Sequence, residues 1–129
     1  MPKVLYAEDV EFLRQGITAD LSQEADFEVS SCDLKYEDTL QKVAAIKPDV
    51  LLLDVMSPTN IHEGIRIAEK LAETLERKTG KLKILLLTIF RKDDDSIKQA
   101  LEDGYADDVV TKPTTSENII YTIRKISGN

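Results

Sequence analysis

Short apolar runs alternate with amphipathic segments five times along the chain. The apolar runs lie at residues 3–7, 27–32, 50–54, 83–88 and 106–111, and polar or turn-forming residues close each of them. Runs of this length bounded by such residues are typical of β-strands. The segments between and after them carry apolar residues at helical spacing. The pattern therefore predicts five strands, each followed by a helix.

The five predicted helices each have an apolar stripe. The stripes are Leu13, Ile17 and Leu21 in the first; Leu40, Val43 and Ile46 in the second; Ile65, Ala68, Ala72 and Leu75 in the third; Ile97 and Leu101 in the fourth; and Ile119, Ile123 and Ile126 in the fifth. Two helix starts are also marked. Ser116 followed by Glu117 is expected to open the last helix, and the acidic residues 93–95 suit the positive amino end of the fourth.

Strict alternation of strand and helix predicts an α/β fold with a parallel sheet and helices on both faces. The runs at 3–7, 50–54 and 83–88 are almost entirely apolar, which is typical of central strands that are covered on both faces. The second and fifth runs contain Glu28, Ser30, Asp107 and Asp108, as edge strands do. We therefore expect a flavodoxin-like (βα)5 domain whose strand order is 2-1-3-4-5.

Composition narrows the class of protein. The chain has 129 residues, of which 42% are hydrophobic and 32% charged, and this length suits one domain with its own core. No apolar run approaches the roughly 18 residues that span a membrane, and the start lacks the pattern of a signal peptide. The single cysteine, Cys32, allows no internal disulfide and is expected to be a small buried hydrophobe. We expect one domain over residues 1–129, without membrane contact, in the cytoplasm.

The net charge limits the partners. Twenty-four acidic residues against seventeen basic ones give a formal charge of -7. A surface of this sign repels phosphate backbones. Direct binding of nucleic acid by this domain is therefore not expected.

Polar residues follow the predicted strands at one edge of the sheet. They are Glu8 and Asp9 after the first strand, Asp54 after the third, Thr88 at the end of the fourth, and Lys112 after the fifth. Each has an ordinary structural interpretation alone, as a turn former, a helix cap, a β-branched strand residue or a loop lysine. Because the carboxyl ends of parallel strands share one edge, we expect all five to converge.

Three converging carboxylates need either a bound proton or a cation to limit their repulsion. Glu8, Asp9 and Asp54 would repel one another unless one is protonated or a positive ion lies among them. Few protein oxygens combined with several waters favour Mg²⁺ over a larger ion. A metal there would polarise an incoming phosphoryl group, and Lys112 and the Thr88 hydroxyl would contact its other oxygens. One carboxylate would remain free to attack.

Four stretches carry a resemblance to a known family: AED at 7–9, PDVLLLDVMSP at 48–58, LLLT at 85–88 and DDVVTKP at 107–113. With them the chain resembles a response-regulator receiver domain, the phosphoacceptor module of two-component signalling, over essentially its full length. The resemblance implies that Asp54 accepts phosphate from a sensor histidine kinase or a histidine phosphotransfer protein. The domain would catalyse its own phosphorylation and dephosphorylation only. It would be free-standing or the amino-terminal part of a longer regulator.

The resemblance also assigns the remaining site residues. Asp9 and Asp54 would bind Mg²⁺ directly together with the backbone carbonyl of Met56, and Glu8 would act through water. Thr88 would be the switch hydroxyl and Lys112 the phosphate-binding lysine, with a cis peptide between Lys112 and Pro113. The fourth helix, fifth strand and fifth helix would form the output surface, where Asp107, Asp108, Arg124 and Lys125 allow either charge-paired homodimerisation or a plain solvated face.

Three positions depart from the family pattern. Pro58 follows Asp54 at the usual spacing, but Gly64 lies ten residues after Asp54 where about eight is usual, so the loop containing His62 carries two extra residues. His62 is expected to be a solvated loop residue rather than a functional base. Ile89 stands after Thr88 in place of a small residue, which predicts partial cover of the site and slower phosphoryl loading and hydrolysis.

The third departure is the switch aromatic. Val109 occupies the position where the family usually has an aromatic residue three before the lysine. Tyr105 and Phe90 are the alternatives. Because of Ile89 and Val109, a receiver fold that binds partners without being phosphorylated is the main rival interpretation.

Other aspartate and phosphate sites fit less well. A dehalogenase-type phosphatase expects a second aspartate two residues after the first, where this chain has Met56. A flavodoxin phosphate loop is incompatible with the acidic AEDV at 7–10, and the glycine-rich phosphate loop of nucleotide switches does not occur.

Overall fold

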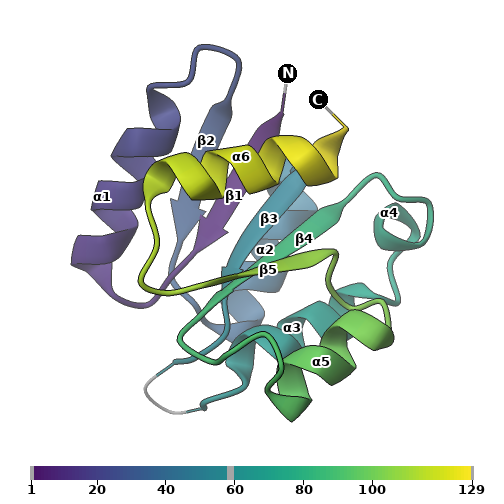
Figure 1. The fold of residues 1–129 in the computed structure, drawn as a ribbon. Helices are drawn as coiled ribbons and strands as arrows, with labels where there is room; N and C mark the ends of the chain where they lie inside the picture. Colours follow the sequence, from purple (N-terminus) through teal and green to yellow (C-terminus); the bar gives the residue numbers. More distant parts are fainter. Residues whose placement is uncertain (1, 58–59, 129) are drawn as a thin grey trace.

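The computed structural model of the chain describes residues 2–57 and 60–128. Its five strands are β1 (Lys3–Ala7), β2 (Glu28–Cys32), β3 (Val50–Asp54), β4 (Lys83–Thr88) and β5 (Asp108–Thr111). They form one parallel sheet in the order β2-β1-β3-β4-β5. The predicted flavodoxin-like order is therefore confirmed, with β2 and β5 at the edges (Figure 1). The second and fifth strands are shorter than predicted, because pairing begins at Glu28 and Asp108.

Helices cover both faces of the sheet. They are α1 (Glu11–Ser22), α2 (Tyr36–Ile46), α3 (Glu63–Leu71), α4 (Leu75–Lys78), α5 (Asp95–Glu102) and α6 (Ser116–Ser127). In Figure 1, α6 crosses the near face beside α1, whereas α2 lies behind the strands. Strand side chains alternate between two cores to match. Leu5, Leu51 and Leu53 pack with α2, α3 and α5, and Val4 and Leu52 pack with α1 and α6.

The extra short helix α4 corrects the prediction of a single third helix running through Leu75. Thr74 divides the segment, because its hydroxyl donates to the carbonyl of Leu71 at 2.6 Å and accepts from the N–H of Arg77 at 3.3 Å. Thr74 thus closes α3 and caps α4. Leu75, predicted to lie in the apolar stripe, is instead 71% exposed.

The other helix starts lie close to their predicted positions. Asp94 caps α5 through the N–H of Ser96, and Thr115 rather than Ser116 caps α6 through the N–H of Asn118. The hydroxyl of Ser116 instead donates to Asp20 of α1 at 2.6 Å. This bond ties the amino end of α6 to α1.

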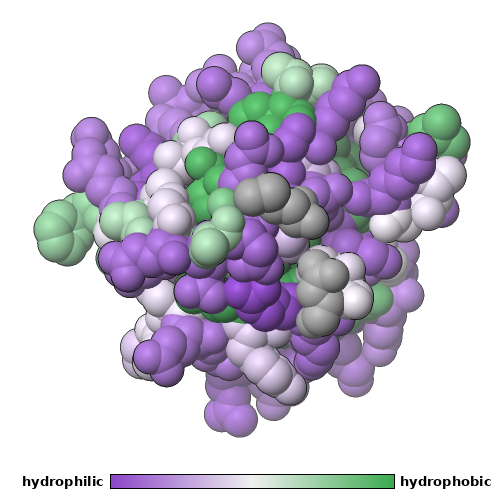
Figure 2. Space-filling model, turned by 90° about the horizontal axis from the view of Figure 1, so that it is seen from above, coloured by the Kyte–Doolittle hydropathy of each residue, from purple (hydrophilic) through white to green (hydrophobic). Residues whose placement is uncertain are grey.

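The end of the molecule where the strands begin has a mostly polar surface (Figure 2). Figure 2 views the molecule from the end where the strands begin and shows a hydrophilic surface with small separate apolar areas. Among the described residues, no helix is both long and apolar enough to cross a membrane.

Candidate functional site

Asp54 is the last residue of the central strand β3. Its Cα pairs with that of Leu87 in β4, and the next N–H, of Val55, donates to the carbonyl of Leu87 at 3.1 Å. The side chain is buried, and its Oδ1 accepts from the N–H of Met56 at 3.4 Å. The backbone of Asp54 is therefore fixed by the sheet, while its carboxylate faces the edge where the strands end.

Glu8 and Asp9 follow the neighbouring strand β1. One carboxylate oxygen from each of Glu8, Asp9 and Asp54 lies within 4.8 Å of the others. Glu8 is fully buried, and it accepts hydrogen bonds from the hydroxyl of Tyr6 at 2.8 Å and from the N–H of Val10 at 3.3 Å. The predicted convergence of the three carboxylates is confirmed.

Lys112 contributes the positive charge of the cluster. Its Nζ lies 3.2 Å from Oδ2 of Asp54 and 3.6 Å from Oε1 of Glu8. The lysine follows β5, and its N–H donates to the carbonyl of Thr88 at 2.7 Å. The peptide bond between Lys112 and Pro113 is cis, as expected.

Two of these carboxyl groups, Glu8 and Asp9, have pKa values raised above their ordinary values. Burial and the adjacent Asp54 raise the pKa of Glu8, although Tyr6 and Lys112 oppose the shift. Burial and the neighbouring Glu8 raise the pKa of Asp9. Both groups would ionise more readily with another cation present. Three carboxylates that share a single lysine supply oxygen ligands that fit a hard divalent cation such as Mg²⁺.

Thr88 lies at the same edge, one strand away from Asp54. It is 1% exposed, and its Oγ1 accepts from the N–H of Phe90 at 3.0 Å. The side chain therefore already has a partner in the loop that follows β4. A hydroxyl that accepts from N–H can still donate its own hydrogen to another oxygen.

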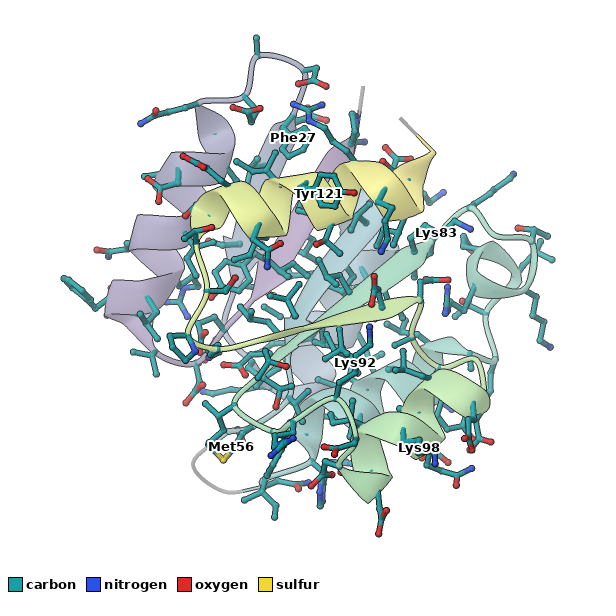
Figure 3. The ribbon with its side chains drawn as sticks, in the orientation of Figure 1. Phe27, Met56, Lys83, Lys92, Lys98 and Tyr121 are labelled. Carbon is teal, nitrogen blue, oxygen red and sulfur yellow. The ribbon has the colours of Figure 1, made fainter. Side chains whose placement is uncertain are left out.

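A cleft of about 330 Å³ opens beside the cluster. Its lining includes Asp9, Asp54, Lys112, Met56 and Ile89. Met56 lies at the lower edge of Figure 3, where the strands end, whereas Lys83 marks the opposite end of the sheet. Ile89 is 56% exposed at the mouth of this cleft. Partial cover of the site by Ile89 stays a prediction.

The longer loop after Asp54 returns to the sheet at Gly64. The N–H of Gly64 donates to the carbonyl of Val55 at 2.8 Å, and a Cβ at this position would overlap the carbonyl oxygen of Asp54. Glycine is therefore required by close backbone contact. Within the loop, Ser57 and Asn60 form an antiparallel bridge. Pro58 lies outside the described residues.

The alternatives for the switch aromatic differ in their contacts. Val109 is 7% exposed and belongs to the core with α2, α3 and α5. Tyr105 and Phe90 are partly buried against the same core. The Phe90 ring also stacks on His62, with centroids 5.9 Å apart and planes inclined by 27°. His62 is exposed, as expected for a loop residue, but it has this ring contact.

The charges predicted at the output surface are paired within the chain. Asp108 contacts Lys92 at 3.4 Å and Lys125 at 3.2 Å (Figure 3 labels Lys92). Asp107 contacts Arg77, and Arg124 contacts Glu24 and Asp26. Ion pairs across a dimer interface would therefore replace existing intrachain pairs.

Two contacts of the site were not predicted from sequence. Tyr6 lies two residues before Glu8, and its hydroxyl donates to the Glu8 carboxylate. Burial and Glu8 raise the pKa of the Tyr6 hydroxyl, so the hydroxyl stays protonated and can donate. A tyrosine in an apolar central strand, two residues before a glutamate, is a signal for this pair. Arg14 of α1 donates to the carbonyl of Glu8 at 2.7 Å. No local pattern predicts that contact.

The predicted burial of Cys32 is confirmed, and burial raises the pKa of its thiol.

Comparisons with known proteins agree with this geometry. The response regulator VraR of Staphylococcus aureus is 30% identical over 97% of this chain, and VraR of Staphylococcus saprophyticus is 29% identical over 98%. The chain spans 56–57% of the length of these relatives. Among solved structures, the BeF3-activated DrrB receiver domain superposes with a TM-score of 0.77 at 28% identity, covering 100% of this chain and 99% of that one.

The fold is shared more widely. A DNA-binding response regulator of the LuxR family from Staphylococcus aureus superposes with a TM-score of 0.80 at 21% identity, covering 98% of this chain and 99% of that chain. The sequence profile of the response regulator receiver domain matches residues 4–124. This match takes in all four segments that supply the carboxylates, the threonine and the lysine, and the chain belongs to the response regulator receiver domain family.

Proposed function

We propose that this domain receives a phosphoryl group on Asp54 from a sensor histidine kinase or a histidine phosphotransfer protein and changes its output surface in response. The contact between Lys112 and Asp54, at 3.2 Å within a cluster of three carboxylates, is the main support. One oxygen of Asp54 lies beside a cation, and the carboxylate borders an open cleft. This is the arrangement that an aspartate nucleophile needs.

The transfer step follows from these positions. An oxygen of Asp54 attacks the phosphorus, the bond to the donor imidazole nitrogen breaks, and the electron pair leaves with that nitrogen. Lys112 pairs with one phosphoryl oxygen, and the Thr88 hydroxyl donates to another. The domain would act on its own phosphorylation and dephosphorylation only.

Asp9, Asp54 and the backbone carbonyl of Met56 would hold Mg²⁺, and Glu8 would act through water. The ion would neutralise charge on the phosphoryl group during transfer. The raised pKa values of Glu8 and Asp9 support this assignment, because burial and the neighbouring carboxylates disfavour their charged forms and a cation would offset this effect.

Apolar side chains around the cleft support docking of a protein donor. Val10, Ile61 and Ile89 line the cleft and are 45–56% exposed, and Phe12 on the first turn of α1 is 84% exposed. Exposed apolar residues beside a polar site favour a protein partner over a small solute.

We expect a cytoplasmic location. The net charge of -7 favours a protein partner over direct contact with nucleic acid.

The output of the domain is also a proposal. Residues 1–129 would act as a single receiver unit. This unit would form a homodimer through α5, β5 and α6, and Asp108 would then exchange its intrachain partners Lys92 and Lys125 for residues of the second copy. Sedimentation velocity with and without beryllofluoride tests this dimer. An unchanged monomer in both conditions would remove it.

Mass spectrometry after incubation with acetyl phosphate and Mg²⁺ tests the phosphoacceptor. We expect one added phosphoryl group on the wild type, and its loss in Asp54→Asn. Asp33→Asn is a matched control, because Asp33 follows β2 at the same edge but contacts Arg14 and Lys35. This variant should be phosphorylated like the wild type.

A domain that binds partners without phosphorylation is the second candidate. Val109 favours it, because this buried residue has no ring and stands where the family has its switch aromatic. Absence of added phosphate on the wild type with both acetyl phosphate and a phosphorylated histidine donor would support this candidate and contradict the phosphoacceptor proposal.

A further inference from the structure

A buried tyrosine hydroxyl lies beside the carboxylate cluster. Tyr6 belongs to the central strand β1, and its side chain is fully buried in the core that faces α1 and α6. Its hydroxyl donates to Oε1 of Glu8 at 2.8 Å. Glu8 is also fully buried. Water therefore does not compete for this hydrogen bond, which makes it stronger than the same bond at the surface.

The Tyr6 hydroxyl is the nearest donor to the Glu8 carboxylate in the described part of the chain. The N–H of Val10 lies 3.3 Å from Oε2, and Nζ of Lys112 lies 3.6 Å from Oε1. Lys112 is closer to Asp54, at 3.2 Å. A neutral hydroxyl thus holds Glu8 most closely, while the lysine ammonium lies nearest to the proposed phosphoacceptor.

Glu8 needs such a donor to stay in the cluster. One of its oxygens lies within 4.8 Å of oxygens of Asp9 and Asp54, so neighbouring negative charge repels it. A glutamate side chain is long and changes rotamer readily unless it is held. The Tyr6 ring is fixed by core packing, and its hydroxyl is therefore a donor at a fixed position.

We propose that Tyr6 is a positioning residue for Mg²⁺. Its hydroxyl keeps the Glu8 carboxylate beside Asp9 and Asp54, so that the three carboxylates are in place before the ion binds. Without the hydroxyl, repulsion turns Glu8 away, and part of the binding free energy of the ion is used to bring the carboxylate back. This inference rests on the proposed function, because it takes Mg²⁺ as the ion at this cluster.

Titration of the isotope-labelled chain with Mg²⁺, without a phosphoryl donor, measures the affinity directly by NMR. The backbone amide resonances of Asp9 and Lys112 report saturation. Tyr6→Phe keeps the ring and its packing but removes the donor. We expect half-saturation of this variant at a Mg²⁺ concentration about 10-fold higher than in the wild type. Loss of a group that supports a metal ligand usually costs about 10- to 100-fold, and the low end applies because Glu8 would act through water.

Two variants separate the hydroxyl from a general effect of the substitution. Tyr121→Phe makes the same chemical change on α6, where Tyr121 is 66% exposed (Figure 3), and should bind Mg²⁺ like the wild type. Replacement of Tyr6 by para-aminophenylalanine returns a hydrogen-bond donor to the same place. This variant should bind Mg²⁺ more tightly than Tyr6→Phe, a recovery that a purely structural role of the ring does not predict.

The outcomes are distinguishable. If the wild type binds Mg²⁺ and Tyr6→Phe binds it equally well or more tightly, the inference is wrong while the proposed function stands. If the para-aminophenylalanine variant behaves like Tyr6→Phe, the donor is not responsible, and the inference is also wrong. If the wild type does not bind Mg²⁺, the proposed metal site and this inference both fail.

Discussion

Arg77 of the short helix α4 is expected to stabilise the whole domain. Its side chain is 8% exposed, and its Nη1 donates to Oδ2 of Asp107 at 2.6 Å and to the carbonyl of Leu82 at 3.0 Å. Its Nη2 donates to the carbonyl of Gly104 at 2.9 Å. These bonds join the connection before β4 to the connection before β5. Arg77→Ala would remove all of them.

The loss of unfolding free energy in Arg77→Ala depends on which partner groups keep other hydrogen bonds. Hydrogen bonds from a charged group contribute about 1.5–3 kcal/mol each. The full sum is not expected, because Asp107 is 25% exposed on its side chain and still accepts from the N–H of Ile84 at 2.7 Å. The backbone carbonyls also regain water. We expect the free energy of unfolding to fall by about 3 kcal/mol, including lost packing of the arginine stem.

Urea unfolding followed by circular dichroism measures this change, and a domain of this size should also melt about 10 °C lower. Arg91→Ala is the control, since that arginine is 85% exposed and contacts Asp93 at 3.4 Å. An exposed pair of this kind should contribute less than about 1 kcal/mol. Asp107→Asn should be milder than Arg77→Ala, because the amide oxygen can still accept from Ile84. If Arg77→Ala lies within about 1 kcal/mol of the wild type, the argument from buried hydrogen bonds is refuted.

Three further predictions concern the site. Without metal, Glu8 and Asp9 have raised pKa values in the folded protein, so these two groups bind protons more tightly than they do in the unfolded chain. Their contribution to stability therefore falls as the pH rises through their folded-state pKa values. Mg²⁺ should therefore raise the melting temperature more at pH 8 than at pH 5, and an equal rise at both would contradict the charge argument. Ile89→Ala should speed both phosphorylation by acetyl phosphate and hydrolysis of the product, which radiolabel decay measures; no acceleration of either would show that Ile89 does not cover the site. Gly64→Ala should lower the free energy of unfolding by about 2 kcal/mol or more, because its Cβ overlaps the Asp54 carbonyl; an unchanged denaturation midpoint would mean that the loop relaxes freely.

The sheet and the cluster were predictable because they depend on short-range patterns. Uniformly apolar runs at 50–54 and 83–88 identify central strands, and their position fixes where Asp54 and Thr88 lie. Once the strands are parallel, their last residues share one edge without further information. This reasoning places Glu8, Asp9 and Lys112 as well.

The remaining features depend on contacts between distant residues. Thr74 and Leu75 fit the helical spacing of α3, so periodicity alone extends that helix too far; the hydroxyl of Thr74 ends it at Leu71. Arg77 resembles any surface arginine in sequence, and its partner Asp107 lies 30 residues away. Ion pairs of this kind leave no local signal.

We expect the two extra residues after Asp54 to affect the rates of phosphorylation and hydrolysis more than the chemistry of the site. Gly64 donates to the carbonyl of Val55 and leaves no space above the Asp54 carbonyl, so the chain must return to the same point whatever the loop length. Ser57 and Asn60 form a bridge before that point. Asp54 is thus held by the sheet and by Gly64, while His62 of the loop lies against Phe90. Substitutions in the loop should therefore alter rates and conformational equilibria, whereas only substitutions at the strand ends should abolish phosphorylation.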